Sequence, residues 1–97
     1  MGPATLHGGI DMLVAPLLAV QLARLTHCLR PDVLVDFRQV TFIDGAGIEV
    51  LAVARDAAIA HGGHLRLLGT HPLTLWILRH PRLDLGFDVL RVLPVAA

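Results

Sequence analysis

Residues 33–37, Val-Leu-Val-Asp-Phe, are the feature that most constrains the fold of this chain. A run this short, this apolar and this rich in β-branched residues is typical of a strand buried on both faces. Asp44 follows soon after and precedes a mostly apolar stretch over 46–61, for which its carboxylate is a good helix N-cap. A strand of this kind followed closely by a helix predicts an α/β domain with a mostly parallel sheet.

The rest of the chain continues this alternation. The pattern predicts strands at residues 4–7, 33–37, 40–43, 65–68 and 89–92. It predicts helices at 13–29, 46–61 and 72–81, with a turn at Gly8-Gly9 and a left-handed cap at Gly62-Gly63. We therefore expect a single domain over residues 1–97, with about four strands and three or four helices.

The apolar pattern predicts which helix faces are buried. In the 13–29 helix, one face would carry Leu18, Leu22, Leu25 and Leu29. In the 46–61 helix, the buried face would carry Ile48, Leu51, Ala52 and Ile59. The opposite side of that second helix, which we expect to be wet, is also apolar and carries Val50, Val53, Ala54 and Ala57. These apolar residues are either scattered surface residues, which are common on soluble proteins, or part of an interface with a partner.

The composition argues against several classes of protein. The formal net charge is zero and the eight arginines are spread along the chain, so the basic stripe of a nucleic-acid binder is missing. No apolar run approaches the roughly 18 residues of a membrane span, and the N-terminus lacks the pattern of an export signal. The single cysteine, Cys28, cannot form a disulfide within the chain and is expected to be at least half-buried. We expect a cytoplasmic protein without membrane insertion.

The sequence also offers few residues that could act in catalysis or bind a metal. Serine, lysine and tyrosine are absent, which removes serine nucleophiles, Schiff-base lysines and tyrosine acids. Of the six histidines, His61 and His64 are the closest pair, and no helix carries two at the i, i+4 spacing of a zinc site. His61 is better explained as a favourable group at a helix C-terminus. We therefore predict no metal, no cofactor and no enzymatic activity; a small enzyme is the alternative from another class.

Residues 33–48 resemble the central motif of the STAS domain, the fold of bacterial anti-sigma factor antagonists. In that motif an apolar strand ends in Asp-Leu, and Phe-Ile-Asp-Ser-Ser/Ala-Gly-Leu follows a short link; here residues 42–48 are Phe-Ile-Asp-Gly-Ala-Gly-Ile. Residues 8–11 and 61–69 resemble the segments on either side, so that the likeness covers about 5–92. It implies a STAS-like fold whose N-terminal edge strand is missing, and a regulatory function through protein binding.

The resemblance also implies a switch that this chain lacks. In the family, a serine kinase that is also the anti-sigma factor phosphorylates the serine after the motif aspartate. Gly45 occupies that phospho-acceptor position, Ala46 follows it, and the nearest hydroxyl, on Thr41, lies inside a predicted strand. We therefore expect a regulator that serine phosphorylation cannot switch. The alternative is a cytoplasmic STAS subunit of an ABC-type membrane transporter.

We predict that the partner binds at the start of the 46–61 helix and at the lone tryptophan. For the Asp44–Gly47 segment, the alternative is a helix cap with a tight turn and no further role. The predicted partner-binding residues are Asp44, Gly45, Ala46, Gly47, Ile48, Val50, Val53 and Trp76. The expected partner is an anti-sigma factor of the serine-kinase type. A neutral, apolar chain with an open sheet edge also predicts a homo-oligomer.

Overall fold

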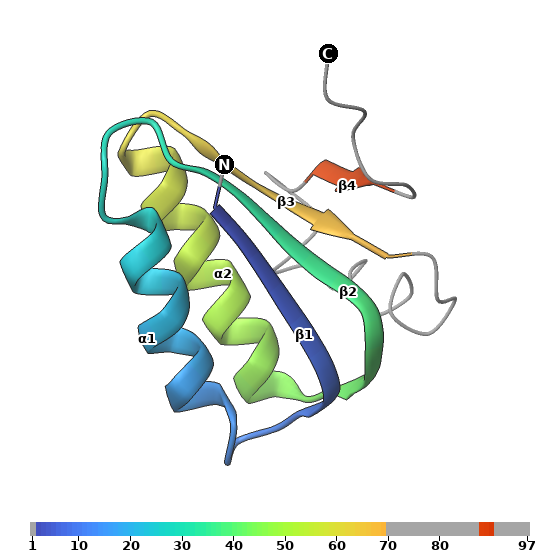
Figure 1. Ribbon diagram of the computed structural model, residues 1–97. Helices are drawn as coiled ribbons and strands as arrows, with labels where there is room; N and C mark the ends of the chain where they lie inside the picture. The colour runs from blue at the N-terminus through green and yellow to red at the C-terminus, as the bar shows by residue number, and fades with distance from the viewer. Residues whose placement is uncertain (1, 70–87, 91–97) are drawn as a thin grey trace.

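The computed structural model describes residues 2–69 and 88–90, in which strands and helices alternate (Figure 1). The strands are β1 (Gly2–Ile10), β2 (Asp32–Ile43), β3 (His64–Leu68) and β4 (Asp88–Leu90). The helices are α1 (Ala15–Thr26) and α2 (Gly45–Ala60). All neighbouring strands are parallel, in the order β1-β2-β3-β4. The predicted α/β class is confirmed, whereas the predicted helix at 72–81 lies outside the described residues.

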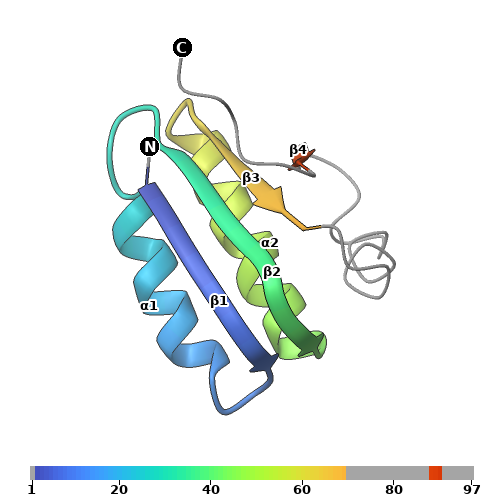
Figure 2. The ribbon, with the colours of Figure 1, turned by 45° about the vertical axis from the view of Figure 1, so that its right-hand side comes forward.

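Helices α1 and α2 lie side by side on one face of the sheet, as both views show (Figure 1, Figure 2). The core lies between the helices and β1, β2 and β3; its fully buried members include Leu22, Phe37, Leu51 and Leu65. Thr26 is buried with them, and its hydroxyl donates to the Leu22 carbonyl oxygen at 3.0 Å. Both helices start at the end of the sheet where β1 and β2 finish, which brings their N-termini together.

Strand β2 is one continuous strand, so the prediction of separate strands at 33–37 and 40–43 was wrong. Its pairing with β1 is irregular at two places. β2 advances from Asp36 to Gln39 while β1 advances only from Thr5 to His7, and a second shift separates Gly8 from Gly9. Extra residues of this kind are β-bulges, which bend a strand without ending it. β1 likewise continues through Gly8-Gly9, where the sequence predicted a turn, because Gly8 takes a φ of +74°.

Helix α1 is shorter than predicted, and this places two side chains differently. It ends at Thr26, so Leu29 falls beyond the helix and is 90% exposed instead of completing the buried face. Cys28 also lies beyond the end of α1 and is exposed, contrary to the prediction that it would be at least half-buried. In α2, Ile59 is also exposed, because eight residues of helix rotate it away from the row that begins at Leu51.

The end of α2 is as predicted. Gly62 has a φ of +79°, and its N–H donates to the Ile59 carbonyl at 3.0 Å. The Gly63 N–H donates to the Ala58 carbonyl at 2.9 Å, which completes a left-handed helix cap. The His61 side chain also bonds a carbonyl group in the last turn of α2, since its Nδ1 donates to the Ala57 carbonyl oxygen at 2.8 Å.

Candidate functional site

Asp44 joins three elements at the end of the sheet where β1 and β2 finish. One carboxylate oxygen, Oδ1, accepts the Gly47 N–H at 3.0 Å and so caps α2, as predicted. The other, Oδ2, accepts the Met12 N–H at 3.1 Å, and the backbone N–H of Asp44 donates to the Ile10 carbonyl at 3.0 Å. The loop after β1 is therefore tied to the start of α2 through a single residue.

Gly45 and Gly47 flank Ala46 but play different structural roles. Gly45 is exposed, and a Cβ added there would meet no atom within 4 Å. Gly47 is buried, and its added Cβ would lie 2.6 Å from Ile43 Cγ1 and 2.9 Å from the Ile10 carbonyl oxygen. Gly47 therefore lets α2 pack closely on the strands and offers no surface to a partner, whereas Gly45 faces solvent.

Of the other predicted residues, Ala46, Ile48 and Val50 are half-buried and Val53 is 55% exposed. Ile48 and Val50 pack against the core with part of their side chains. Ala54, which we expected on a wet face, is buried, because that side of α2 faces α1. Trp76 lies outside the described residues.

The sequence interpretation missed a set of exposed apolar side chains next to Asp44. Met12 and Leu13, in the loop that Asp44 holds, are 70% and 81% exposed, and Leu17 in the first turns of α1 is 74% exposed. Phe42, two residues before Asp44, is 48% exposed. The spacing of Leu13, Leu17 and Val20 at i, i+4 and i+7 was the available signal, since it marks a second apolar row besides the buried one.

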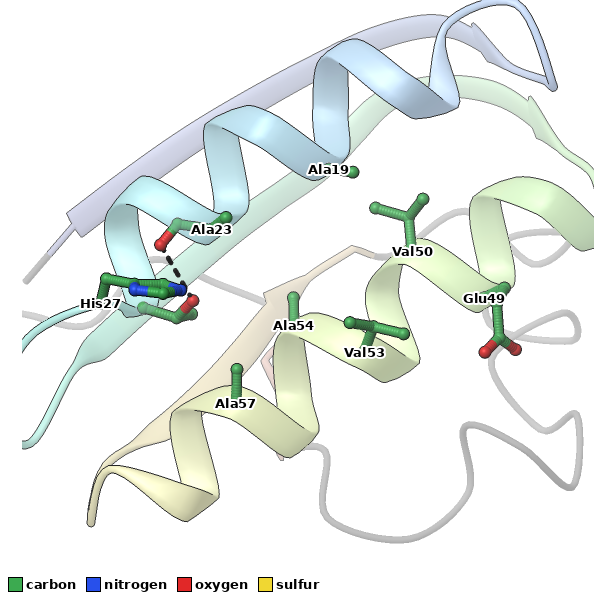
Figure 3. A pocket seen from close by; sticks show the side chains of 9 residues that line it. Ala19, Ala23, His27, Glu49, Val50, Val53, Ala54 and Ala57 are labelled. Carbon is green, nitrogen blue, oxygen red and sulfur yellow. Dashed lines mark hydrogen bonds between the residues drawn. The ribbon is translucent and has the colours of Figure 1, made fainter.

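An apolar groove of about 230 Å³ runs between α1 and α2 (Figure 3). Its walls are mostly small side chains, with one acid and one imidazole: Ala19, Ala23, Thr26, His27, Glu49, Val50, Val53, Ala54 and Ala57. In the close-up, Ala19 and Ala23 face α2, and Val50 faces α1. The predicted residues Val50 and Val53 therefore belong to a shaped surface that begins near the Asp44 cap.

The ion pair within β2 is structural in character. Asp36 in β2 accepts the Arg38 backbone N–H at 3.0 Å, and Arg38 Nη2 lies 2.8 Å from its Oδ2. The hydrogen-bonding guanidinium of Arg38 lowers the pKa of the Asp36 carboxyl, against the opposing effect of partial burial. Within residues 2–69 and 88–90, no three His, Cys, Asp or Glu side chains are grouped as metal ligands would be. What the described surface offers is an apolar area around a carboxylate that accepts two backbone N–H groups.

The sequence model of the STAS domain matches residues 4–87. The chain belongs to the STAS domain family. No protein of curated function matches it in sequence. Neither α1 nor α2 has the length and apolar character that crossing a membrane requires, and these are the helices of the described part of the chain.

Solved structures share the fold of this STAS domain at low sequence identity. An anti-sigma factor antagonist from Mycobacterium paratuberculosis superposes with a TM-score of 0.80 at 23% identity, covering 94% of this chain and 77% of that one. The anti-sigma factor antagonist SpoIIAA in its unphosphorylated form gives 0.72 at 14% identity, covering 92% and 77%. The Bacillus cell fate determinant SpoIIAA in its phosphorylated form gives 0.67 at 15% identity, covering 88% and 78%. The predicted STAS-like fold is confirmed.

Proposed function

We propose that this STAS domain is an anti-sigma factor antagonist that acts by binding an anti-sigma factor in the cytoplasm, without catalysis of its own. Its solved structural neighbours include two proteins described as anti-sigma factor antagonists, which makes this the first function to test. The observation that carries the proposal is the surface around Asp44, whose carboxylate bonds both the start of α2 and the loop that carries the exposed Met12 and Leu13 side chains. Exposed apolar patches on small proteins mark sites of interaction.

The proposed interface runs from the Asp44 cap along the first half of α2. Gly45 and Val53 supply exposed positions, Val50 lies between them, and Met12 and Leu13 border the start of the helix. The Asp44 carboxylate accepts two backbone N–H groups, which lowers the cost of covering this charge with a partner. The apolar side chains around it are the part of this surface that a partner with an apolar contact surface would cover favourably.

The proposed antagonist cannot be switched by serine phosphorylation, because the chain contains no serine and Gly45 occupies the acceptor position. A phosphate adds about two negative charges, which would disrupt an apolar interface. Gly45 is exposed, so the position itself is open to a kinase, and only the hydroxyl is missing. A serine kinase would then be unable to end the binding of the anti-sigma factor by phosphorylating this chain.

Titration of the chain with anti-sigma factors of the serine-kinase type from the source organism tests this proposal. We expect Val53→Asp to weaken binding at least tenfold with an unchanged melting temperature, because a charge in a packed interface is desolvated and unpaired. Leu29→Asp is the matched control, since Leu29 is exposed but lies in the loop after α1. Absence of binding to every such kinase, or equal weakening by both substitutions, would contradict the proposal.

Restoring the acceptor tests the switch separately. Gly45→Ser fits, because an added Cβ meets no atom within 4 Å, and a phosphate there would lie favourably at a helix N-terminus. We expect the kinase to phosphorylate this variant in the presence of ATP and then release it, while the wild-type chain stays bound and unmodified. Stoichiometric phosphate on a threonine of the wild-type chain, found by mass spectrometry, would show that the unswitchable assignment is wrong.

A further inference from the structure

The C-terminal ends of α1 and α2 carry two histidines that meet in space. His27 is the C-cap residue of α1, and His61 is the C-cap residue of α2. Their ring centroids lie 5.8 Å apart, with the ring planes inclined at 37°. Both residues are exposed, so ions in solution can reach the pair. Two accessible imidazoles therefore lie together at the opposite end of α2 from the Asp44 cap.

Spacing along the chain does not reveal this pair. His61 and His64 are the closest histidines in sequence, but His64 belongs to β3 and its Nε2 lies 2.9 Å from Asp32 Oδ1. His27 is far from His61 in sequence. Helices α1 and α2 run side by side in the same direction, which brings their last residues together (Figure 1). The prediction of no metal considered spacing in the sequence, whereas this pair is a product of the fold.

The separation of the two rings fits a shared metal ion. A metal lies about 2 Å from the imidazole nitrogen that binds it, and hence about 3 Å from the centroid of that ring. Two imidazoles bound to one ion at tetrahedral or wider angles therefore have centroids about 5 to 6 Å apart. The observed separation of 5.8 Å falls in this range. One ion can thus reach both rings after no more than a rotation of exposed side chains.

The hydrogen bond of the His61 ring leaves free the nitrogen that a metal needs. Because Nδ1 donates to the Ala57 carbonyl oxygen at 2.8 Å, the lone pair of the neutral ring is on Nε2. Histidines that bind metals commonly donate their other ring N–H to a backbone carbonyl, which fixes the ring and makes the free nitrogen a better ligand. The bond to Ala57 therefore prepares His61 to bind a metal.

Backbone hydrogen bonds hold the two histidines in place. The His27 N–H donates to the Ala23 carbonyl at 3.1 Å, and the His61 N–H donates to the Ala57 carbonyl at the same distance. The Arg30 N–H donates to the His61 carbonyl at 2.9 Å, which ties the loop after α1 to the end of α2. Ligands on a backbone that is already fixed lose little freedom when an ion binds.

The ends of the two helices also favour a cation at this place. Carbonyl groups without helical partners give each helix C-terminus a partial negative charge, and two such termini lie side by side here. The arginines nearest to His27 in sequence, Arg24 and Arg30, are exposed, so water and salt screen their repulsion of an ion.

We propose that His27 and His61 bind one divalent transition-metal ion of the class that prefers imidazole, such as Zn²⁺ or Cu²⁺. Among the described residues no group of three His, Cys, Asp or Glu side chains is formed, so water completes the coordination. The ion links the C-terminal ends of α1 and α2 at the groove between them, which His27 lines (Figure 3). This site is independent of the proposed function.

Calorimetric titration of the full chain, made without a histidine tag, with zinc chloride and with copper chloride tests the site. We expect one ion per chain, and at least a tenfold higher dissociation constant for His27→Gln and for His61→Gln. Glutamine keeps an N–H donor for the Ala57 carbonyl, and position 27 is exposed, so both variants should fold. His64→Gln is the matched control and should bind the ion as the wild-type chain does. Saturating zinc should raise the melting temperature of the wild-type chain by about 4 °C or more.

Two further measurements separate this site from other binding. Cys28 is an exposed thiol next to His27, so Cys28→Ala should bind the ion with unchanged affinity. Paramagnetic Cu²⁺ should first broaden the amide signals at the C-terminal ends of α1 and α2. Loss of binding in Cys28→Ala, or first broadening around His7 or Asp44, would overturn the proposal. Several weakly bound ions per chain, with equal affinities in the wild-type chain and both glutamine variants, would show an adventitious ion only.

Discussion

The two ends of the parallel sheet differ in what they show to solvent. At the end where β1 and β2 finish, the carboxylates of Asp44 and Asp11 accept local backbone N–H groups, and large apolar side chains, including Met12 and Leu13, are exposed. At the end where β2 and β3 begin, Leu29 is exposed in the loop before β2, but the side chains at the strand starts are polar and paired: Asp32 Oδ1 lies 2.9 Å from both Arg66 Nη2 and His64 Nε2. Paired charges can face water without a partner, whereas bare apolar groups are better covered. The difference supports the proposal that a partner binds at the first end, which we call the binding end.

The comparison implies that the binding end depends on close backbone packing more than on polar bonds, and Gly47→Ala tests this. The added Cβ would lie 2.9 Å from the Ile10 carbonyl oxygen, a backbone atom that cannot move aside without shifting β1. We expect a loss of about 2 kcal/mol in the free energy of unfolding, as in other overpacked sites. Urea denaturation followed by circular dichroism measures this loss.

Gly45→Ala is the matched control for that experiment, since the two glycines lie two residues apart in the first turn of α2. An added Cβ at position 45 meets no atom within 4 Å, and alanine is a better helix former than glycine. The control variant should be as stable as the wild-type chain or slightly more stable. If both variants lose the same stability, the packing at Gly47 is not what holds this end together.

Asp44→Ala should have the next largest effect. The substitution removes the N-cap of α2 and the bond to the Met12 N–H, and losing such a cap costs about 1 kcal/mol. Asp44→Asn keeps an oxygen acceptor and should lose far less stability. Hydrogen exchange sharpens the test: Asp44→Ala should speed exchange at the Met12 and Gly47 amides, and unchanged rates there would show that the cap does not hold the loop.

The sequence predicted the two ends of α2 well, because local chemistry decides the structure there. The Asp44 cap and the cap at Gly62 follow from residue types at particular places in a helix, and both are confirmed. The course of β2 was mispredicted because Arg38 and Gln39 are polar and resemble a link between two strands. In the structure they are exposed in a bulged part of one strand, which depends on pairing with β1 and cannot be read from local pattern.

The exposed apolar side chains were missed for a related reason. Leu17 and Leu22 are equally apolar in sequence, yet one is 74% exposed and the other is fully buried. Periodicity shows that α1 has two apolar rows, but only the sheet decides which row is covered. Ala54 illustrates the converse, since we expected it to face solvent and α1 buries it. Helix-to-helix contacts of this kind are set by tertiary structure.

The smallest effect is predicted for the charged end of the sheet, where Asp32→Asn removes the carboxylate charge that Arg66 and His64 share. The Asp32 and Arg66 side chains are 39% and 21% exposed, so water screens much of the attraction and the loss should be about 0.5 kcal/mol. In a domain of this size that corresponds to a fall in melting temperature of roughly 2–4 °C, which calorimetry resolves. Raising the ionic strength should reduce the difference further, because salt screens exposed charges. Self-association and anti-sigma factor binding should be unchanged. Weaker association of Asp32→Asn, with its fold intact, would show that both ends of the sheet take part in binding, and the division drawn between them would then fail.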